Sequence, residues 1–570
     1  MTEPQTTKNT AAKRPVIRLE KRVVRLLAVV ILFGALLRLV GLGWSLPDNR
    51  HPYATYHPDE RINLNAALQA DVSHLKFDIG FYNYGAFYFY LVNVSHIVGR
   101  AYSVIPEPPQ NVSNTMPFVA KENAGLFLMG RLVTALMGIA TIPVIFGIGR
   151  RLYRDHVGLF AALLYAIAPL AVVHAHFFTV DVPSTLFVAL ALLYAARLLE
   201  NVTTRDIVLA GVWTGLAAAT KYNAVLVGIA PLAALFLTPA KEGENSTRLT
   251  RKPFLSVIIL LASIIFTFLI ACPGVWLNFE AFWNGIPNYP GSGVRYELFE
   301  HSREGHGELF LKTGIGAMYH LLISLPQGLG IPFVLLFLVG LGVAIRHRTP
   351  ADKMLLAFFF LAYLLYSLSA VRFARYMLPL FPVICVLAAR AIVERKPNTF
   401  GKFTFVLGMT AGVVAAWMSV LCVGIMSGKD PRDAAADWLE KNAKSGASVA
   451  FGRIPWFTSP PLHPRFGLPA APQRAEAVND TSRYTFRIPS SEWDKGVLEP
   501  LPDYTIVSNL ETMHPLRLDN SETIAFLNAA KINRNAQIST TGFPNAFFGT
   551  HTLISEDMLY ILPEVIIYYE

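Results

Sequence analysis

The sequence predicts a polytopic α-helical membrane protein of about eleven spans with interfacial helices in its first external loop, followed by a small C-terminal α/β soluble domain. Of the 570 residues, 53% are hydrophobic and only 15% are charged, whereas soluble domains average about 25% charged residues. The mean hydropathy is +0.42. The apolar runs are continuous rather than alternating, and only helices or closed barrels can span lipid. Continuous runs therefore indicate helices.

The apolar runs give the positions of the expected spans, and the basic loops between them give their orientation across the membrane. The first span, residues 26–46, is too long for the apolar region of a signal peptide. Lys and Arg collect in every second loop after it, and the positive-inside rule places those loops in the cytoplasm with the basic N-terminus. The remaining expected spans are residues 130–149, 157–175, 182–199, 206–222, 224–238, 254–272, 328–345, 354–370, 376–392 and 403–426.

This topology divides the chain into three parts. They are a cytoplasmic basic tail at 1–25, a membrane domain at 26–426 with long external loops 47–128 and 273–325, and an external soluble α/β domain at 427–570. Residues 81–105 are aromatic and apolar, but a span there would invert every later loop, so we expect a helix lying on the outer leaflet. In the last part we expect a helix at Ala434–Lys444 and strands at Ser448–Phe451, Tyr504–Val507 and Leu559–Tyr569.

Charge and cysteine usage exclude other classes. The net charge of +10 belongs to topology-determining loops, with phosphate-bearing membrane lipids as the second use, so no nucleic-acid partner is expected. Cys272, Cys385 and Cys422 lie in or beside apolar runs without a CxxC partner. A disulfide framework or zinc site is therefore not expected.

The pentapeptide Tyr56-His57-Pro58-Asp59-Glu60 follows the first span. Two adjacent carboxylates beside a membrane are costly, which marks Asp59 and Glu60 as functional candidates. The alternative is that Pro58, Asp59 and Glu60 form the first turn of a helix, where negative charge faces the helix dipole.

Other ionisable side chains gather on the same predicted outer side, and the cations among them oppose the positive-inside bias. A phosphate-bearing ligand would explain them, because Arg binds phosphate bidentately and Lys supplies a point charge. The alternatives stay open: Asp181 can be a helix N-cap, the histidines can be interfacial, and Lys or Arg can snorkel. The set is His174, His176, Asp181, Lys221, Arg372, Arg375 and Tyr376.

Together these residues resemble a known family. Residues of about 25–425 are similar to the polytopic glycosyltransferases of the C-type superfamily, above all to the protein O-mannosyltransferase and lipid A aminoarabinose transferase group. The order of motifs carries the resemblance, although the Lys-Pro-Pro often found after the aromatic stretch is missing and the tail differs from that of the mannosyltransferases. The motifs are Asp59-Glu60, Phe81–Tyr90, Arg131 to Tyr153, Asp181-Val182-Pro183, Thr220-Lys221-Tyr222 and Arg375-Tyr376-Met377-Leu378-Pro379.

The resemblance implies transfer of a sugar from a polyprenyl-phosphate donor at the external face of a membrane, here expected to be a bacterial plasma membrane with the site on the periplasmic side. The acceptor can be a glycan, a lipid or a protein. A flippase or transporter of lipid-linked sugars is the alternative, although such proteins favour repeats and midplane charges that are not evident here. A receptor or scaffold would leave the outward charges unexplained.

For such a transfer, Asp59 is our candidate general base in an inverting single displacement. Glu60 would orient Asp59 or the sugar, and Asp181 would position the acceptor or join Asp59 in a divalent-metal site. No cofactor is required, because cations can neutralise the phosphate alone. The donor phosphate would bind Arg372, Arg375, Tyr376 and Lys221, and His57, His176 and Tyr84 would contact substrate.

Overall fold

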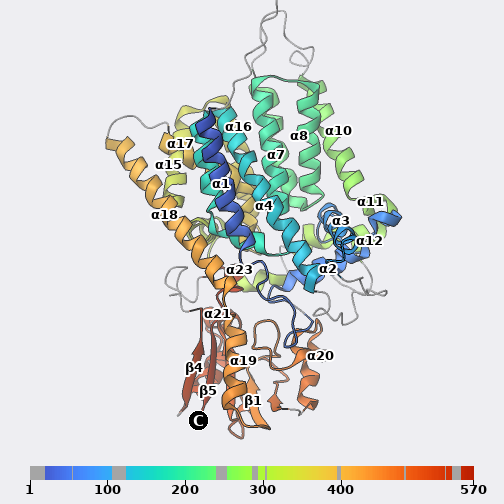
Figure 1. Ribbon diagram of the computed structural model, residues 1–570, viewed down its shortest axis with the longest axis vertical. Coiled ribbons are helices and arrows are strands. Elements are labelled where there is room, and N and C mark those ends of the chain that lie inside the picture. The colour runs from blue at the N-terminus through green and yellow to red at the C-terminus, as the bar shows by residue number, and fades with distance from the viewer. Residues whose placement is uncertain are drawn as a thin grey trace, which may run out of the picture.

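The protein is a helical bundle with a five-stranded domain at one end (Figure 1). The computed structural model describes residues 20–53, 55–105, 124–238, 253–285, 293–301, 305–393, 399–480, 483–532, 534–541 and 554–570. Most of the predicted basic tail and parts of the predicted loops 47–128 and 273–325 therefore lie outside the described residues.

A helix occupies each predicted span. The bundle consists of α1 (Lys21–Leu39), α4 (Ala124–Leu152), α5 (Asp155–Ala166), α6 (Pro169–Val173), α7 (Asp181–Glu200), α8 (Thr204–Ala218), α9 (Ile229–Leu237), α10 (Pro253–Ala271), α15 (Ile331–His347), α16 (Pro350–Ser367), α17 (Phe381–Val393) and α18 (Thr399–Ser427).

Fewer helices than the predicted eleven spans meet the criteria of length and apolar composition for crossing a membrane. Within the described part of the chain, six helices are long and apolar enough to cross a membrane, or up to eight if each of two bent pairs is one span. The predicted count of eleven is therefore not confirmed. The helix α8 has only 15 residues, and α1 carries Lys21, Arg22, Arg25 and Arg38.

The surface of the bundle fits a membrane. Large apolar side chains are exposed along α10 and α18, among them Phe254, Phe266, Phe403 and Trp417. A soluble monomer rarely leaves such continuous apolar surface in water. By contrast, α17 is buried along nearly its whole length. These features are those of an integral membrane protein with α17 at its centre.

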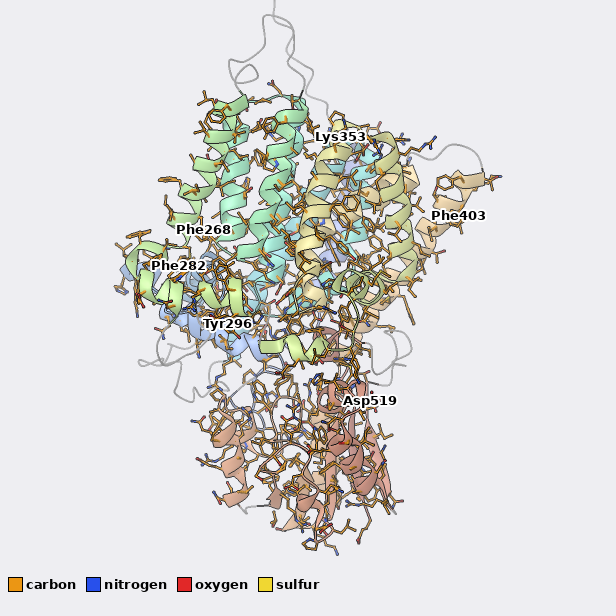
Figure 2. The ribbon with its side chains drawn as sticks, turned by 180° about the vertical axis from the view of Figure 1, so that it is seen from behind. Phe268, Phe282, Tyr296, Lys353, Phe403 and Asp519 are labelled. Carbon is orange, nitrogen blue, oxygen red and sulfur yellow. The ribbon has the colours of Figure 1, made fainter. Side chains whose placement is uncertain are left out.

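Short helices lie at one end of the bundle, beside the C-terminal domain (Figure 1). The helix α3 (Phe87–Ala101), which falls within the segment expected on the outer leaflet, lies at this level with α2 (Pro58–Gln69), α11 (Gly274–Leu277) and α12 (Phe279–Asn284). Figure 2 shows Lys353 at the far end of the bundle, Asp519 in the C-terminal domain and Tyr296 between them.

The C-terminal domain is built on a mixed sheet of order β2-β1-β3-β5-β4. The strand β1 pairs in parallel with β2 and β3, and β5 pairs antiparallel with β3 and β4. Val449, Phe451 and Ile506 form the core of one face. The strands are β1 (Ala447–Phe451), β2 (Tyr484–Arg487), β3 (Tyr504–Ser508), β4 (Asn535–Ser539) and β5 (Val565–Tyr569), with helices α19 (Pro431–Asn442), α20 (Ala471–Ala475), α21 (Asn509–Arg517), α22 (Ser521–Lys531) and α23 (Glu556–Leu559).

The last predicted strand began too early. Residues Glu556–Leu559 are helical in α23, and β5 starts only at Val565. Ile554 and the apolar residues from Met558 to Leu562 are buried in the same core as the membrane bundle rather than in the core of the domain. Contacts with the bundle therefore decide the local structure of this segment, which we call the C-terminal strap (residues 554–562).

Candidate active site

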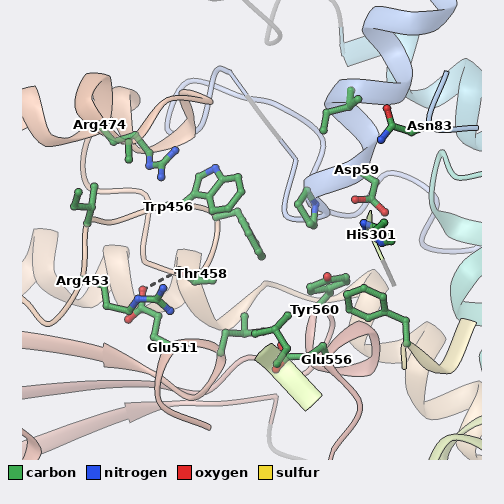
Figure 3. A pocket seen from close by; sticks show the side chains of 18 of the residues that line it. Asp59, Asn83, His301, Arg453, Trp456, Thr458, Arg474, Glu511, Glu556 and Tyr560 are labelled. Atoms are coloured by element: carbon green, nitrogen blue, oxygen red, sulfur yellow. Dashed lines mark hydrogen bonds between the residues drawn. The ribbon is translucent and has the colours of Figure 1, made fainter. Parts of the chain in front are cut away.

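A cavity of about 670 Å³ lies between the end of the bundle and the C-terminal domain. One wall comes from the bundle end and the other from the domain, with the strap between them (Figure 3). Bundle-side lining residues include Asp59, Asn83, Tyr84, Glu297, Arg375 and Tyr376, and domain-side residues include Arg453, Trp456, Thr458, Arg474, Glu492 and Glu511.

Asp59 reaches the cavity from the first turn of α2. The ring of His57 caps this helix by accepting the N–H of Asp59, at 3.3 Å between the nitrogens, and Pro58 occupies the first helical turn. Negative charge in that turn is favoured by the helix dipole. The predicted helix start is therefore present, and it directs the Asp59 carboxylate into the cavity, where it is a quarter exposed.

Arg375 lies opposite Asp59, on the short 3-10 helix η8 (Ala374–Leu380). Its Nη2 donates to Asp59 Oδ2 at 3.2 Å, and its Nε is 3.9 Å from Asp181 Oδ2. The guanidinium also lies 4.0 Å from the ring centre of Phe373. Its Nη1 is buried and has no hydrogen-bond partner among the described residues. A buried, unsatisfied donor of a cation is costly, so this atom is suited to an anionic ligand.

Asp181 and Lys221 form a second charge pair behind Arg375. Lys221 Nζ donates to Asp181 Oδ1 at 2.6 Å and lies 4.4 Å from the ring centre of Tyr376. Asp181 is the first residue of α7, and no side chain caps that helix, so the predicted alternative of an N-cap is wrong. Its carboxylate instead neutralises Lys221 and faces Arg375.

The C-terminal strap fixes the backbone that carries Arg375. Asp557 Oδ1 accepts the N–H of Ala374 at 3.1 Å, and Oδ2 accepts the N–H of Arg375 at 2.8 Å. His174 Nε2 lies 3.5 Å from the same carboxylate. Burial alone would raise the pKa of Asp557, but His174, Arg375 and the Ser555 hydroxyl outweigh it and hold that pKa well below its usual range.

Glu60 points away from the cavity. Both of its carboxylate oxygens accept bonds from Arg131, at 2.7 and 2.6 Å, and the N–H of Phe178 donates to one of them at 2.8 Å. Both side chains are fully buried. Burial alone would raise the pKa of Glu60, but the Arg131 guanidinium lowers it below its usual value. Glu60 therefore anchors α2 to α4, and it does not face a sugar.

Some of the other predicted site residues line the cavity, and others lie behind its wall. Tyr84 and Tyr376 line the cavity, and Tyr84 is held there because Tyr222 donates to its carbonyl at 2.9 Å. His57 lies behind Asp59 against Tyr560, with ring centres 4.9 Å apart, and burial lowers its pKa to about 4.

Besides His57 and Lys221, two more of the predicted binding residues, His176 and Arg372, lie outside the cavity lining. His176 is buried, with its ring nitrogens 2.9 Å from the Val172 carbonyl and 2.8 Å from the Val40 carbonyl. Arg372 donates to Thr313 at 2.8 Å and to the Gly314 carbonyl at 2.6 Å. Both side chains are therefore occupied in joining segments of the chain, and neither lines the cavity with Arg375.

Comparison with known proteins agrees with the resemblance seen in the sequence. Residues 126–270 match the family model described as dolichyl-phosphate-mannose-protein mannosyltransferase. This confirms the predicted similarity to membrane glycosyltransferases that use lipid-linked sugars. The matched stretch contains Arg131, Asp181 and Lys221, while Asp59 and Arg375 lie outside it. No curated protein matches the sequence significantly.

Solved structures give a more distant likeness. ArnT from Cupriavidus metallidurans, bound to undecaprenyl phosphate, matches with 17% identity and a TM-score of 0.46 over 74% of this chain and 73% of its own. The oligosaccharyltransferase AglB from Archaeoglobus fulgidus, in complex with an inhibitory peptide and a dolichol-phosphate, matches with 12% identity and a TM-score of 0.46 over 91% of this chain and 73% of its own. The Pmt1-Pmt2 complex of S. cerevisiae, bound to its sugar donor, matches with 14% identity and a TM-score of 0.35 over 47% of this chain and 35% of its own.

A divalent metal between Asp59 and Asp181 does not fit the residues present. Each carboxylate already has a cationic partner, Arg375 for Asp59 and Lys221 for Asp181. Within the part of the chain that the structure describes, no group of three His, Cys, Asp or Glu side chains could hold a metal ion. Cationic side chains therefore supply the positive charge of this site.

The sequence analysis did not identify two acidic residues of the cavity, Glu297 beside Tyr296 and Glu556 in the strap. Glu297 accepts from Asn83 at 2.8 Å, and burial raises its pKa to about 7. Glu556 is buried in the cavity wall, its pKa is also raised to about 7 by burial, and its Oε1 has no partner among the described residues. The one available signal was the apolar run after Glu556-Asp557 in an otherwise polar tail.

Proposed function

We propose that this protein transfers a sugar from a polyprenyl-phosphate donor to an acceptor hydroxyl in the cavity between bundle and C-terminal domain, with inversion at the sugar carbon. One observation carries the proposal. The buried guanidinium of Arg375 is fixed beside a carboxylate that reaches the cavity, and its Nη1 has no hydrogen-bond partner within the part of the chain that the structure describes.

Arg375 is the proposed binding group for the donor phosphate. The leaving lipid phosphate gains negative charge as the bond to the sugar breaks, and a preorganised cation stabilises that charge without reorganising. Arg375 lies on η8, between the bundle helices α16 and α17 in the chain, so a lipid tail can remain beside apolar helices while its phosphate reaches the site. Lys221 supports Arg375 indirectly, by neutralising Asp181.

Asp59 is the proposed general base. In a single displacement the acceptor oxygen forms a bond to C1 of the sugar while the bond from C1 to the phosphate oxygen breaks. The acceptor proton passes to the Asp59 carboxylate, and the polyprenyl phosphate leaves with the electron pair. The ion pair with Arg375 holds the Asp59 carboxylate at the cavity, where it can accept that proton.

Glu60 and His57 have supporting roles in this proposal. Glu60 and Arg131 hold α2 against the bundle, and His57 caps the turn that presents Asp59. Tyr84 and Tyr376 line the donor side of the cavity and would contact the sugar. The family match is to transferases, so it gives no support to the alternative of a flippase.

The test uses the purified protein in lipid nanodiscs with radiolabelled undecaprenyl-phosphate sugars and an envelope extract as acceptor. Asp59→Asn is expected to lower turnover by about 10²- to 10⁴-fold, the usual contribution of a general base, while undecaprenyl phosphate still binds. Asp48→Asn, an exposed acid on the same segment, is the control and should retain turnover. Full activity of the Asp59 variant, or a product with retained anomeric configuration, would refute the mechanism.

A further inference from the structure

The domain side of the cavity has a chemistry different from that of the bundle side. Asp59 lies at one end of the close view, and Arg453, Trp456, Arg474 and Glu511 lie at the other (Figure 3). If the donor phosphate binds Arg375 at the bundle end, the far end is left for the acceptor. What binds there can be read from the side chains that line it.

Arg453, Glu492 and Glu511 at this far end already have polar partners. Arg453 forms an ion pair with Glu492, and the hydroxyls of Thr458 and Ser459 each donate to Glu511 at 2.8 Å. Burial raises the pKa of Glu511. An acceptor anchored here by a phosphate or carboxylate would have to break such pairs, so the wall favours a neutral ligand.

Arg474 bonds to the protein through Nη1, while its Nε is buried with no hydrogen-bond partner among the described residues. Its Nη1 donates to the Leu468 carbonyl at 2.9 Å and to the Pro469 carbonyl at 2.7 Å, and its guanidinium lies 4.7 Å from the ring centre of Trp456. Phe457 packs edgewise on the same indole, with ring centres 4.7 Å apart. Trp456 is thus held in place from two sides, yet it remains 37% exposed and lines the cavity.

A fixed indole surface beside hydrogen-bonding groups of both kinds matches one chemical class. A sugar ring has an apolar C–H face that can lie on an aromatic ring, and hydroxyls that each donate one hydrogen bond and accept others. Paired guanidinium and carboxylate groups can exchange hydrogen bonds with such hydroxyls and keep their own charge balance. An acyl chain would displace water from these groups and offer no hydrogen bonds in its place.

From this lining we infer that the domain end of the cavity, built around Trp456 with Arg453, Arg474, Glu492 and Glu511, is a subsite for a neutral carbohydrate, so the acceptor is a glycan. That this carbohydrate is the acceptor rests on the proposed function. The carbohydrate subsite itself rests only on the side chains that line it. Its hydroxyl to be glycosylated would extend past Tyr560 toward Asp59.

The experiment measures binding to the full-length protein in nanodiscs by saturation-transfer NMR. The probes are neutral gluco- and manno-hexaoses, a Ser/Thr-rich decapeptide and a short-chain phospholipid. Wild type is expected to bind at least one of the hexaoses and not the peptide. Trp456→Ala should lower that affinity about tenfold, and Trp456→Phe, which retains an aromatic face, should lose less. Trp276→Ala, an equally aromatic but largely exposed position outside the cavity lining, should bind as wild type does.

Two results would overturn the subsite: neither hexaose binds wild type, or Trp456→Ala and Trp456→Phe bind the sugar unchanged. Preferred binding of the peptide or of the phospholipid would assign the acceptor to that class instead. Undecaprenyl phosphate is titrated separately. Its failure to bind wild type would remove the proposed function and leave a carbohydrate subsite, whereas lipid-phosphate binding with no sugar binding would do the reverse.

Discussion

Asp557 holds the backbone of Arg375 from 182 residues further along the chain, with its Oδ2 accepting the Arg375 N–H at 2.8 Å. The other oxygen accepts the N–H of Ala374 at 3.1 Å. The C-terminal strap therefore determines where the proposed phosphate-binding guanidinium lies. A side chain that never touches substrate can in this way control donor affinity.

The strap contact predicts a defect in donor binding. Asp557→Asn keeps the size of the side chain but places an amide donor against backbone donors, so the turn at Arg375 should shift. We expect about tenfold weaker binding of undecaprenyl phosphate, measured by titration in nanodiscs. Asp519→Asn removes the exposed ion pair with Lys312, which also links the domain to the bundle, and should leave the affinity unchanged. A folded Asp557→Asn protein with wild-type affinity would contradict the positioning role.

Arg375 and Arg372 should differ in their effects, although they are three positions apart. Arg375→Ala removes a buried charged donor and should weaken undecaprenyl phosphate binding by about 10- to 100-fold, the range of hydrogen bonds to charged groups. Arg375→Lys should recover part of this, because charge returns without the planar fork. Arg372→Ala serves as the control, since its guanidinium binds Thr313 and Gly314. Equal losses in the two alanine variants would argue against a specific clamp.

The ion pair of Glu60 with Arg131 should matter for stability. Glu60→Gln leaves the fully buried Arg131 without a counter-charge, which typically costs about 3–5 kcal/mol. The melting temperature in detergent should fall, while turnover per folded molecule stays close to that of wild type. The double variant Glu60→Gln/Arg131→Met should recover part of the loss. An unchanged melting temperature with a large loss of turnover would instead make Glu60 a catalytic residue.

Glu556 should make stability depend on pH. Its pKa is about 7 in the folded protein against an ordinary value of 4.5, so the folded state favours the protonated form. Stability is therefore undiminished below about pH 4.5, falls as the pH rises through 7, and stays lower above it. The melting temperature of Glu556→Gln should equal that of wild type at pH 4.5. At pH 8 it should be higher than that of wild type, by a difference equivalent to roughly 3 kcal/mol of unfolding free energy. Identical melting curves at pH 8 would show that Glu556 is not buried as a neutral acid.

Sequence patterns predicted the inner part of this site because topology and local signals agreed there. Asp59 follows Pro58 at a helix start, and Asp181 and Lys221 each lie at the end of an apolar run that the basic loops predict to be external, so a shared side could be inferred. The pairing of Asp59 with Arg375, 316 positions later, could not, because it depends on how α2 and η8 pack together in the folded chain. The same limit applies to Glu60 and Asp59, which are neighbours in sequence but face opposite ways.

The strap was mispredicted for a related reason. Met558 to Leu562 is a short apolar run before a true strand, and periodicity cannot separate a buried strand from a buried helical turn. Its partners are bundle residues, such as Gln327, whose side-chain oxygen accepts the Ser555 N–H at 2.9 Å. Only tertiary contacts therefore distinguish this segment from the strand that follows it.

The position of the strap in the chain also sets an order of events during biosynthesis. Residues 554–562 follow every bundle helix in the sequence, so all of those helices emerge from the ribosome before Asp557 can contact the Arg375 turn. Until the strap has docked, the enzyme would hold Arg375 without its final restraint. In the proposed mechanism the phosphate-binding turn is therefore completed last, after every bundle helix has been synthesised.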